Sequence, residues 1–352
     1  METFWFAALS GMLTIYVLLD GFDFGVGMLH LIAARTDAER RMMLAAIGPI
    51  WNGNEVWLIA GGGLLFFAFP QAYAAGFSGF YLALILVLWL LMFRGLAIEL
   101  RSHFEHPVWR SFWDASFSVA SLALAVVFGA ALGNLIRGVP LNSEGYFFVA
   151  LWTDFLPGRN PGILDWFTVL LGLTSMVLLT VHGATYLTMK TGGELVERVW
   201  SVAGRAGWLA AGLLCFVVAA LPFVQPGLRD NYDDHPVGYT FPLVGLAGLV
   251  LLLLNLRRRQ AGPAFMSSCV MIAGFLASVA MGMFPHLLIA TTNPAHSLTA
   301  FNAAASPYGL RVGAWWFAFG IALALTYTII AHRVFGGRVP MGGSPADRQG
   351  TH

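Results

Sequence analysis

Residues 20–27 read Asp20-Gly21-Phe22-Asp23-Phe24-Gly25-Val26-Gly27, and this stretch decides what kind of protein the chain forms. It lies within an apolar run over residues 4–32, long enough to cross a bilayer, which takes roughly 20 apolar residues. A charged side chain at the bilayer centre costs roughly 3 kcal/mol on insertion scales, so acids there usually face protein or water. We therefore expect a membrane-spanning helix whose two aspartates face other parts of the protein.

The spacing within this stretch predicts how the helix packs. Asp20 and Asp23 are three residues apart, so they share one helical face. Gly21 and Gly25 are four residues apart, the small-xxx-small pattern at which membrane helices approach closely, and Gly27 adds a further small residue. We expect the glycines to bring a neighbouring helix close to the two acids.

Composition points to a membrane protein with many spans. The chain has 352 residues, of which 58% are hydrophobic and 11% charged, and its mean hydropathy is +0.73. Soluble domains carry about 25% charged residues. The net charge of +1 gives no overall field for nucleic acid, so we expect no nucleic-acid partner. Cys215 and Cys269 lie in apolar runs without CxxC spacing, which indicates neither a disulfide framework nor covalent haem attachment.

The apolar runs predict an all-α fold, a polytopic membrane helix bundle in one domain over residues 1–335. We expect about nine transmembrane helices, because no alternating ten-residue pattern of barrel strands is present. The expected helices cover residues 4–32, 44–69, 74–99, 113–136, 163–188, 206–224, 240–256, 264–290 and 312–335.

The distribution of basic residues predicts the orientation of the bundle. With the N-terminus outside, most Lys and Arg residues fall on cytoplasmic loops and the C-terminal tail. The outer loops then hold Arg137, Arg159, Arg229 and Arg311. This asymmetry favours an odd number of helices with the C-terminus in the cytoplasm. Residues 336–352, rich in Gly and Pro, are expected to form a flexible cytoplasmic tail.

A polar cluster is predicted in the inner half of the membrane. Asn52 and Glu55 share a face of the second run, at a depth similar to that of the two aspartates on the antiparallel first helix. Arg94, near the inner end of the third run, is the counter-charge, unless it snorkels to the headgroups. The expected cluster comprises Asp20, Asp23, Asn52, Glu55, Arg94 and Glu99, and the residues expected to pack around it are Gly21, Gly25, Gly27, Trp51, Gly53 and Trp57.

Two readings of this cluster remain open on the residues alone. Buried carboxylates commonly mark routes for protons or ions, and they also form ion pairs that only hold helices together.

Other isolated polar residues have ordinary explanations. His182 and His286, expected inside the fifth and eighth helices, could ligate haem or donate to a carbonyl. Asp114 and Asp165 are expected near helix starts, where acids suit the helix dipole.

The motifs resemble those of subunit II of the cytochrome bd-type quinol oxidases, including the cyanide-insensitive branch. The similar segments are residues 20–27, 48–58 (Gly-Pro-Ile-Trp-Asn-Gly-Asn-Glu-Val-Trp-Leu), 67–74, 93–101, 182–184 and 190–191. The resemblance implies a subunit that binds no haem, supports assembly and delivers protons from the cytoplasm, while haem-bearing subunit I oxidises quinol and reduces oxygen. It further implies the bacterial inner membrane, contact with the quinol pool and membrane lipids, and room for a structural quinone and a small accessory subunit.

Carried over by position, Asp20 and Asp23 match the two acids of the first-helix motif. Asn52 stands where the family commonly has Asp, and an amide has no proton to release. Our hypothesis is that Glu55, aided by Asp23, takes the titrating role.

The alternative function is an ion- or proton-coupled transporter. Transporters, however, tend to have broken helices in both halves of the chain, whereas the polar groups here lie in the first hundred residues. A third possibility is a haem-bearing cytochrome that uses His182 or His286.

Overall fold

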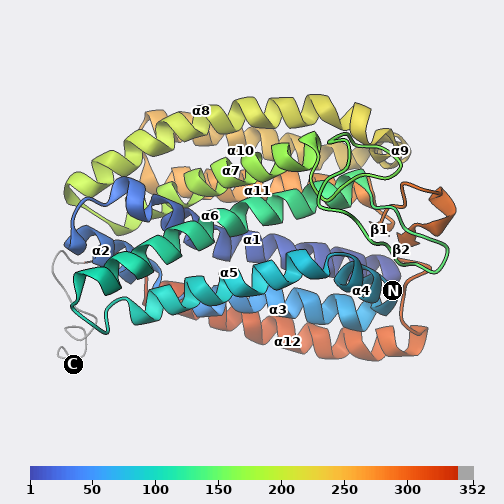
Figure 1. The fold of residues 1–352 in the computed structure, drawn as a ribbon, viewed down its shortest axis with the longest axis horizontal. Helices are drawn as coiled ribbons and strands as arrows, with labels where there is room; N and C mark the ends of the chain where they lie inside the picture. The colour runs from blue at the N-terminus through green and yellow to red at the C-terminus, as the bar shows by residue number, and fades with distance from the viewer. Residues whose placement is uncertain (340–352) are drawn as a thin grey trace.

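The computed structural model describes residues 1–339, which form an elongated bundle of helices running side by side along its length (Figure 1). Successive long helices alternate in direction, as short connections between antiparallel neighbours require. The α-helices are α1 (Glu2–Ala33), α2 (Asp37–Ile47), α3 (Trp51–Ala68), α4 (Pro70–Gly79), α5 (Tyr81–Leu100), α6 (Pro107–Arg137), α7 (Trp166–Lys190), α8 (Gly193–Val224), α9 (Asp230–Asp234), α10 (Thr240–Arg257), α11 (Ala261–Met283) and α12 (Pro307–Val334). The remaining elements are the 3₁₀ turns η1 (Pro226–Arg229), η2 (Pro236–Tyr239) and η3 (Pro294–His296), and the strands β1 (His286–Leu288) and β2 (Leu298–Thr299).

Three of the predicted helices have wrong bounds. In each of them the structure interrupts or ends the helix inside the predicted run. The run 44–69 is divided into α2 and α3 around Pro49, which lacks a backbone N–H. The run 74–99 belongs to α4, which begins at Pro70, and α5, with a break at Phe80. The run 264–290 leaves the helix after Met283, before Pro285, and residues 286–288 instead pair as a short antiparallel ribbon with residues 298–299.

Eight helices of the described chain are long and apolar enough to cross a membrane, namely α1, α5, α6, α7, α8, α11, α12 and the segment that contains α10. The ninth expected span corresponds to α3, which lies lengthwise in the same bundle beside α12 (Figure 1). Its first two turns contain Asn52, Asn54 and Glu55, which lower its hydropathy. The count of nine spans stays a prediction, because length and apolarity identify eight candidate helices in the described chain. The outside position of the N-terminus also stays a prediction.

Helix α1 is the centre of the bundle. It contacts α3, α6, α7 and α11, and every residue from Asp20 to His30 is buried. A Cβ on Gly25 would lie 2.1 Å from the Leu179 carbonyl oxygen and 2.6 Å from the Gly183 Cα of α7. The two helix backbones therefore approach as closely as glycine allows. This contact holds α1 in one rotation about its axis and turns its acids toward α3 and α5.

The end of the described chain lies against α7. The Val339 N–H donates to the Lys190 carbonyl at 2.8 Å, and Val339 is buried. Residues 336–339 of the predicted tail are therefore attached to the bundle. Residues 340–352, the rest of that tail, lie outside the described residues.

Candidate functional site

Arg94 lies at the centre of a buried ion cluster between α1, α3 and α5. Its Nη1 donates to Asp20 Oδ1 at 2.5 Å, and its Nη2 donates to Glu55 Oε2 at 3.0 Å. The guanidinium also lies over the Phe24 ring, 4.6 Å from its centroid. The side chains of Arg94 and Asp20 are fully buried, whereas that of Glu55 is 21% exposed. Because the guanidinium is buried among these partners, Arg94 does not snorkel to the headgroups.

Asp23 is held by Asn54, which the sequence did not single out. Asn54 Nδ2 donates to Asp23 Oδ2 at 2.9 Å and to the Leu19 carbonyl at 3.3 Å. The expectation that Asn52 faces the aspartates is wrong. Asn52 is two residues earlier, about 200° around the helix, and it is exposed. The face of α3 toward α1 instead follows the buried residues Asn54, Trp57, Gly61, Leu64 and Ala68.

Asn52 and Glu99 lie beside the cluster without hydrogen bonds to it in the described chain. Glu99 is exposed at the end of α5, so its expected membership of the ion cluster is wrong. Both residues, together with Glu55, line a hollow of about 340 Å³ between α3 and α5. Trp51 also lines this hollow, where its ring packs against Gly95. The hollow connects the exposed side of Glu55 to the polar end of α5.

Several buried polar atoms of the cluster have no hydrogen-bond partner among residues 1–339. These atoms are Tyr16 Oη, Asp20 Oδ2, Asp23 Oδ1 and Arg94 Nε. Each aspartate thus uses one carboxylate oxygen for a hydrogen bond to Arg94 or Asn54, and Asp20 also interacts with Tyr16 and Asp23 inside the cluster. Buried polar groups are nearly always satisfied, so such atoms mark positions for ordered water or for a bound proton.

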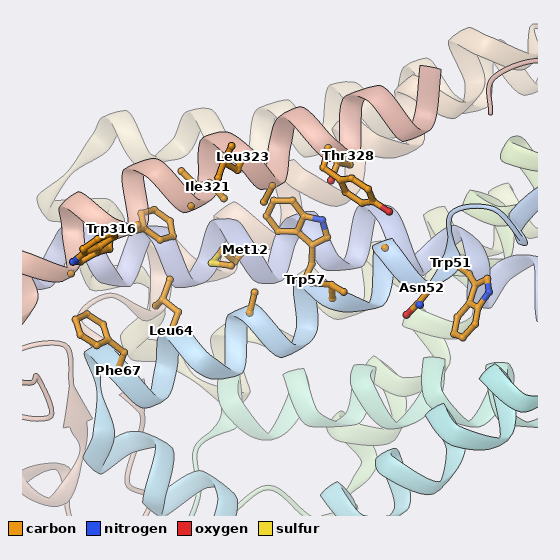
Figure 2. A pocket seen from close by; sticks show the side chains of 18 of the residues that line it. Met12, Trp51, Asn52, Trp57, Leu64, Phe67, Trp316, Ile321, Leu323 and Thr328 are labelled. Atoms are coloured by element: carbon orange, nitrogen blue, oxygen red, sulfur yellow. The ribbon is translucent and has the colours of Figure 1, made fainter. Parts of the chain in front are cut away.

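A larger, mostly apolar groove of about 1080 Å³ lies between α1, α3 and α12 (Figure 2). Trp57, Leu64 and Phe67 of α3 and Trp316 and Leu323 of α12 line it. At its polar end Gly53 approaches Tyr327, and a Cβ there would lie 3.3 Å from the Tyr327 ring. Of the residues of α12, all within the described range, Leu310 alone is buried. Of the eight candidate spans, α12 is therefore the one least buried by the rest of the described chain.

A second buried ion network, at the C-terminal end of α1, was not anticipated. Asp114 accepts from Arg101 Nε at 2.5 Å and from Arg40 Nη1 at 3.0 Å, and its Oδ1 lies 2.6 Å from His30 Nε2. Asp114 was expected to stabilise a helix start, but α6 begins at Pro107 and Asp114 is buried two turns later. The sequence feature that could have identified Asp114 as a buried site is its position inside an apolar run, which is the feature that identified Asp20 and Asp23.

Asp37, which is partly exposed, binds Arg101 and so extends this network to the protein surface. Arg101 Nη2 donates to Asp37 Oδ1 at 2.8 Å, and Arg110 Nη1 donates to Oδ2 at 3.2 Å. Burial alone would raise the pKa of Asp37, but the hydrogen bond from Arg101 and the charges of Arg101, Arg110 and Arg41 outweigh it and lower that pKa. Since the Asp37 side chain is 38% exposed, the network extends from solvent to fully buried His30.

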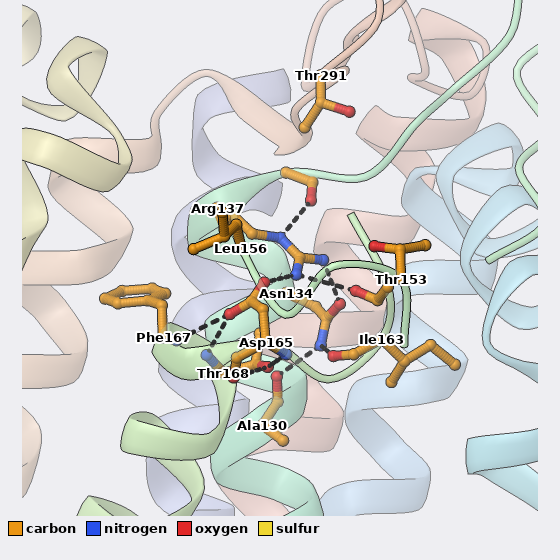
Figure 3. Close-up of polar contacts among 12 residues, drawn as sticks. Ala130, Asn134, Arg137, Thr153, Leu156, Ile163, Asp165, Phe167, Thr168 and Thr291 are labelled. Carbon is orange, nitrogen blue, oxygen red and sulfur yellow. Dashed lines mark hydrogen bonds and ion pairs between the residues drawn. The ribbon is translucent and has the colours of Figure 1, made fainter. Parts of the chain in front are cut away.

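At the opposite end of the bundle, Arg137 and Asp165 join α6 to α7 (Figure 3). Asp165 accepts from the backbone N–H groups of Phe167 and Thr168 at 2.8 and 2.9 Å, so it caps α7 as expected of an acid at a helix start. Arg137 donates to Asp165 and, at 3.0 Å, to the Gly162 carbonyl. These bonds attach the loop before α7 to the end of α6, which is a structural role.

Of the two candidate haem ligands, His182 lies inside a helix as expected, whereas His286 does not. Both ring nitrogens of His182 are engaged, Nδ1 with Ser268 Oγ at 2.8 Å and Nε2 with the Leu18 carbonyl at 2.9 Å. Its ring also stacks on Phe265, which leaves no nitrogen for a metal. His286 is not in a helix, contrary to expectation, but in β1, where it pairs with Thr299. The geometry thus favours the core-histidine reading of His182 over haem ligation.

Comparisons with known proteins agree with this arrangement. Residues 1–335 match the family model described as cytochrome bd terminal oxidase subunit II. The chain is 34% identical over 361 residues to cytochrome bd-I ubiquinol oxidase subunit 2 of Escherichia coli (strain K12), covering 95% of this chain and 94% of that protein. It is 30% identical over 315 residues to cytochrome bd ubiquinol oxidase subunit 2 of Bacillus subtilis (strain 168), covering 89% of each.

A solved structure shares the fold. The chain superposes on one chain of the bd oxidase from Geobacillus thermodenitrificans with a TM-score of 0.72, covering 95% of this chain and 98% of that one, at 19% sequence identity. At this identity the match shows the common fold, while the family match over residues 1–335 shows descent. The chain therefore belongs to the cytochrome bd terminal oxidase subunit II family.

Proposed function

We propose that this chain delivers protons from the cytoplasmic side of the membrane to subunit I of a bd-type quinol oxidase through the cluster formed by Asp20, Asp23, Glu55 and Arg94. As a member of the family, the chain is a multi-pass subunit of a quinol-oxidising, oxygen-reducing complex of the bacterial inner membrane. Haem chemistry belongs to the partner, subunit I. The family match supports this function and not an ion- or proton-coupled transporter.

The spare carboxylate oxygens carry the proposal. Asp20 Oδ2 and Asp23 Oδ1 are buried without a protein partner among the described residues, while their other oxygens are held by Arg94 and Asn54. Each acid can therefore bind and release a proton without losing the contact that positions it. Two carboxylates, Asp20 and Glu55, bind the Arg94 guanidinium, and Asp23 is the third acid of the cluster. The cluster therefore becomes neutral by binding two protons, which favours proton uptake in a low-dielectric site.

The hollow between α3 and α5 supports an entrance at Glu55. Asn52, Glu55 and Glu99 all line this hollow, and Asn52 and Glu99 are more exposed than Glu55. An amide orders water but releases no proton, so Asn52 serves as a hydrogen-bonding wall and Glu55 serves as the first titrating group. Glu55 then passes a proton to the neighbouring Asp20, since both acids bind the same guanidinium.

Substitution of Glu55 in the assembled oxidase tests this proposal. Glu55→Gln keeps the shape and removes the titrating group, and we expect oxygen consumption and proton uptake to fall by about tenfold or more. Asn52→Asp is expected to raise the rate of a Glu55→Gln background by restoring an acid to the hollow. Glu197→Gln, which breaks an exposed pair with Arg259, is the matched control and should leave the rates unchanged. Unchanged rates in Glu55→Gln with normal haem content would contradict the proposal.

We also propose that the groove between α3 and α12 holds a structural quinone through its isoprenoid chain. The groove is long, apolar and lined with tryptophans, which suits an extended hydrocarbon chain (Figure 2). Leu64→Trp would fill it, and we expect solvent extraction to recover less quinone per complex at unchanged haem content. Exposed apolar side chains on α5 and α12 offer further surface for subunit I, a small accessory subunit and membrane lipids.

A further inference from the structure

Three exposed arginines lie where helices α8 and α10 reach the boundary of the apolar layer. Arg205 directly precedes the apolar run of α8 at residues 206–224, and Arg257 and Arg258 directly follow the apolar run of α10 at residues 240–256. By the helical rise, the residues of α8 before Arg205 extend that helix about 18 Å beyond this level. The two helices therefore mark one boundary, at the depth where lipid headgroups lie.

The nearby carboxylates are already bound to other arginines. Glu194 pairs with Arg198 at 3.5 Å, and Glu197 pairs with Arg259 at 2.6 Å. Arg259 turns away from the axis of α10 because its φ is 53°, the left-handed conformation that commonly ends a helix. Within residues 1–339, the three exposed arginines at the boundary form no ion pair with a carboxylate. Their positive charge is therefore not neutralised by the described chain.

An aromatic ring, and not an acid, holds Arg257. Its guanidinium carbon lies over the Trp208 ring, 5.0 Å from the centroid, and Trp208 is 54% exposed. A cation–π contact orders the side chain but leaves most of its five N–H donors unused. Arg205 lies one turn before Trp208 on the same face of α8, and its Nη2 donates to Ser201 Oγ at 2.7 Å. The two guanidiniums thus belong to one exposed surface around Trp208, with donors to spare.

An apolar surface continues from Trp208 toward the centre of the membrane. Helices α8 and α10 lie side by side at an edge of the bundle (Figure 1). They touch closely, since a Cβ on Gly207 would lie 2.8 Å from Leu256 Cδ1. Farther along the same helices, Phe216 and Leu251 are 59% and 50% exposed. Positive charge at the boundary with hydrocarbon below it matches the two parts of an anionic phospholipid.

We propose that Arg205, Arg257 and Trp208 form a binding site for one anionic phospholipid. Its phosphate diester lies between the two guanidiniums, and its acyl chains lie along α8 and α10. Arginine suits this ligand, because its planar fork of donors binds phosphate oxygens in pairs. Trp208 is a positioning residue at the headgroup level, where tryptophan is common in membrane proteins. Arg258 adjoins the site and adds to its positive charge.

The site selects lipids by headgroup charge. A zwitterionic headgroup carries its own cation beside the phosphate, so it gains less from arginines that lack an acid partner than an anionic headgroup does. The site is separate from the proposed proton route, which lies between α1, α3 and α5. Its failure would therefore leave the proposed function untouched.

Lipid titration of the assembled oxidase tests this site. Native mass spectrometry of the delipidated complex in detergent counts the phosphatidylglycerol molecules bound at each lipid concentration. We expect Arg257→Gln to weaken the tightest binding event about fivefold, and the double substitution Arg205→Gln and Arg257→Gln to weaken it about 25-fold, from the usual contribution of one arginine near an anionic lipid surface. Arg35→Gln is the matched control. Arg35 is an exposed arginine between α1 and α2 without an ion pair to a described carboxylate, and its substitution should leave the affinity unchanged.

The remaining arms identify the ligand. Phosphatidylcholine should bind more weakly than phosphatidylglycerol, and inorganic phosphate at the same concentration should not displace the bound lipid. Trp208→Leu keeps an apolar side chain at the boundary and should weaken phosphatidylglycerol about two- to fivefold through loss of the cation–π contact. Equal affinities of Arg257→Gln and Arg35→Gln, equal binding of the two lipids, or displacement by inorganic phosphate would overturn the site. Loss of the haem-bearing subunit from the double variant would show that this surface contacts protein, and would overturn it as well.

Discussion

Replacement of Arg94 by Gln should destabilise the subunit strongly, because it leaves buried acids without a counter-charge. Arg94 binds Asp20 at 2.5 Å and Glu55 at 3.0 Å. Breaking a fully buried pair by removing one partner costs about 3–5 kcal/mol, and the Arg94–Asp20 pair is fully buried on both sides. The pair with Glu55 adds less, since that carboxylate is 21% exposed and partly screened. We therefore expect a loss near the upper end of the range of about 3–5 kcal/mol for Arg94→Gln.

A double-substitution cycle checks this magnitude. Asp20→Asn in the Arg94→Gln background removes the uncompensated charge, and we expect it to recover at least half of the lost stability. The assay is thermal unfolding of the purified oxidase in detergent, followed by loss of haem absorbance, with subunit content measured in parallel. Arg94→Lys is the matched control for charge, since it keeps one cation but cannot bind both acids at once. If Arg94→Gln is as stable as the wild type, or if Asp20→Asn adds a second full loss, the ion-pair reasoning is refuted.

Three other perturbations have defined outcomes. Gly25→Ala should impair assembly, because its Cβ would lie 2.1 Å from backbone in α7, whereas Gly62→Ala, with nothing within 4 Å, should not; the yield of haem-containing complex measures both. Asp165→Ala removes a helix cap and a buried ion pair and should cost about 3 kcal/mol or more in thermal unfolding, and a change below about 0.5 kcal/mol would contradict it. The lowered pKa of Asp37 means that its contribution to stability is fully present above about pH 4 and is lost as the pH falls through its folded pKa. The melting-temperature difference between wild type and Asp37→Asn should therefore shrink with acidification, and a constant difference down to about pH 2 would refute this assignment.

The sequence by itself determined the class of protein and the helix that matters most. Acids inside an apolar run are costly, so Asp20 and Asp23 had to face protein, and the periodic glycines beside them had to face a close neighbour. The structure places Gly25 against Gly183 and Asp20 against Arg94. These inferences needed only local spacing, because residues on one helix keep fixed relations to one another.

Only the tertiary structure decided which partners meet those acids. Asn52 and Asn54 are equally polar, but the packed face of α3 turns Asn54 toward Asp23 and leaves Asn52 in the hollow between helices. The rotation of a helix about its own axis depends on its neighbours, and an apolar run with polar residues on several sides does not specify it.

The contact between His30 and Asp114 joins residues 84 positions apart. It depends on how α6 packs against α1, and therefore on Gly27, whose missing side chain admits Ser121. Spacing along one helix predicts which residues share a face, but the opposite side of the contact is set by the packing of the whole bundle. For this reason the acids of α1 could be identified from sequence, whereas their partners Arg94 and Asn54 became visible only in the folded chain.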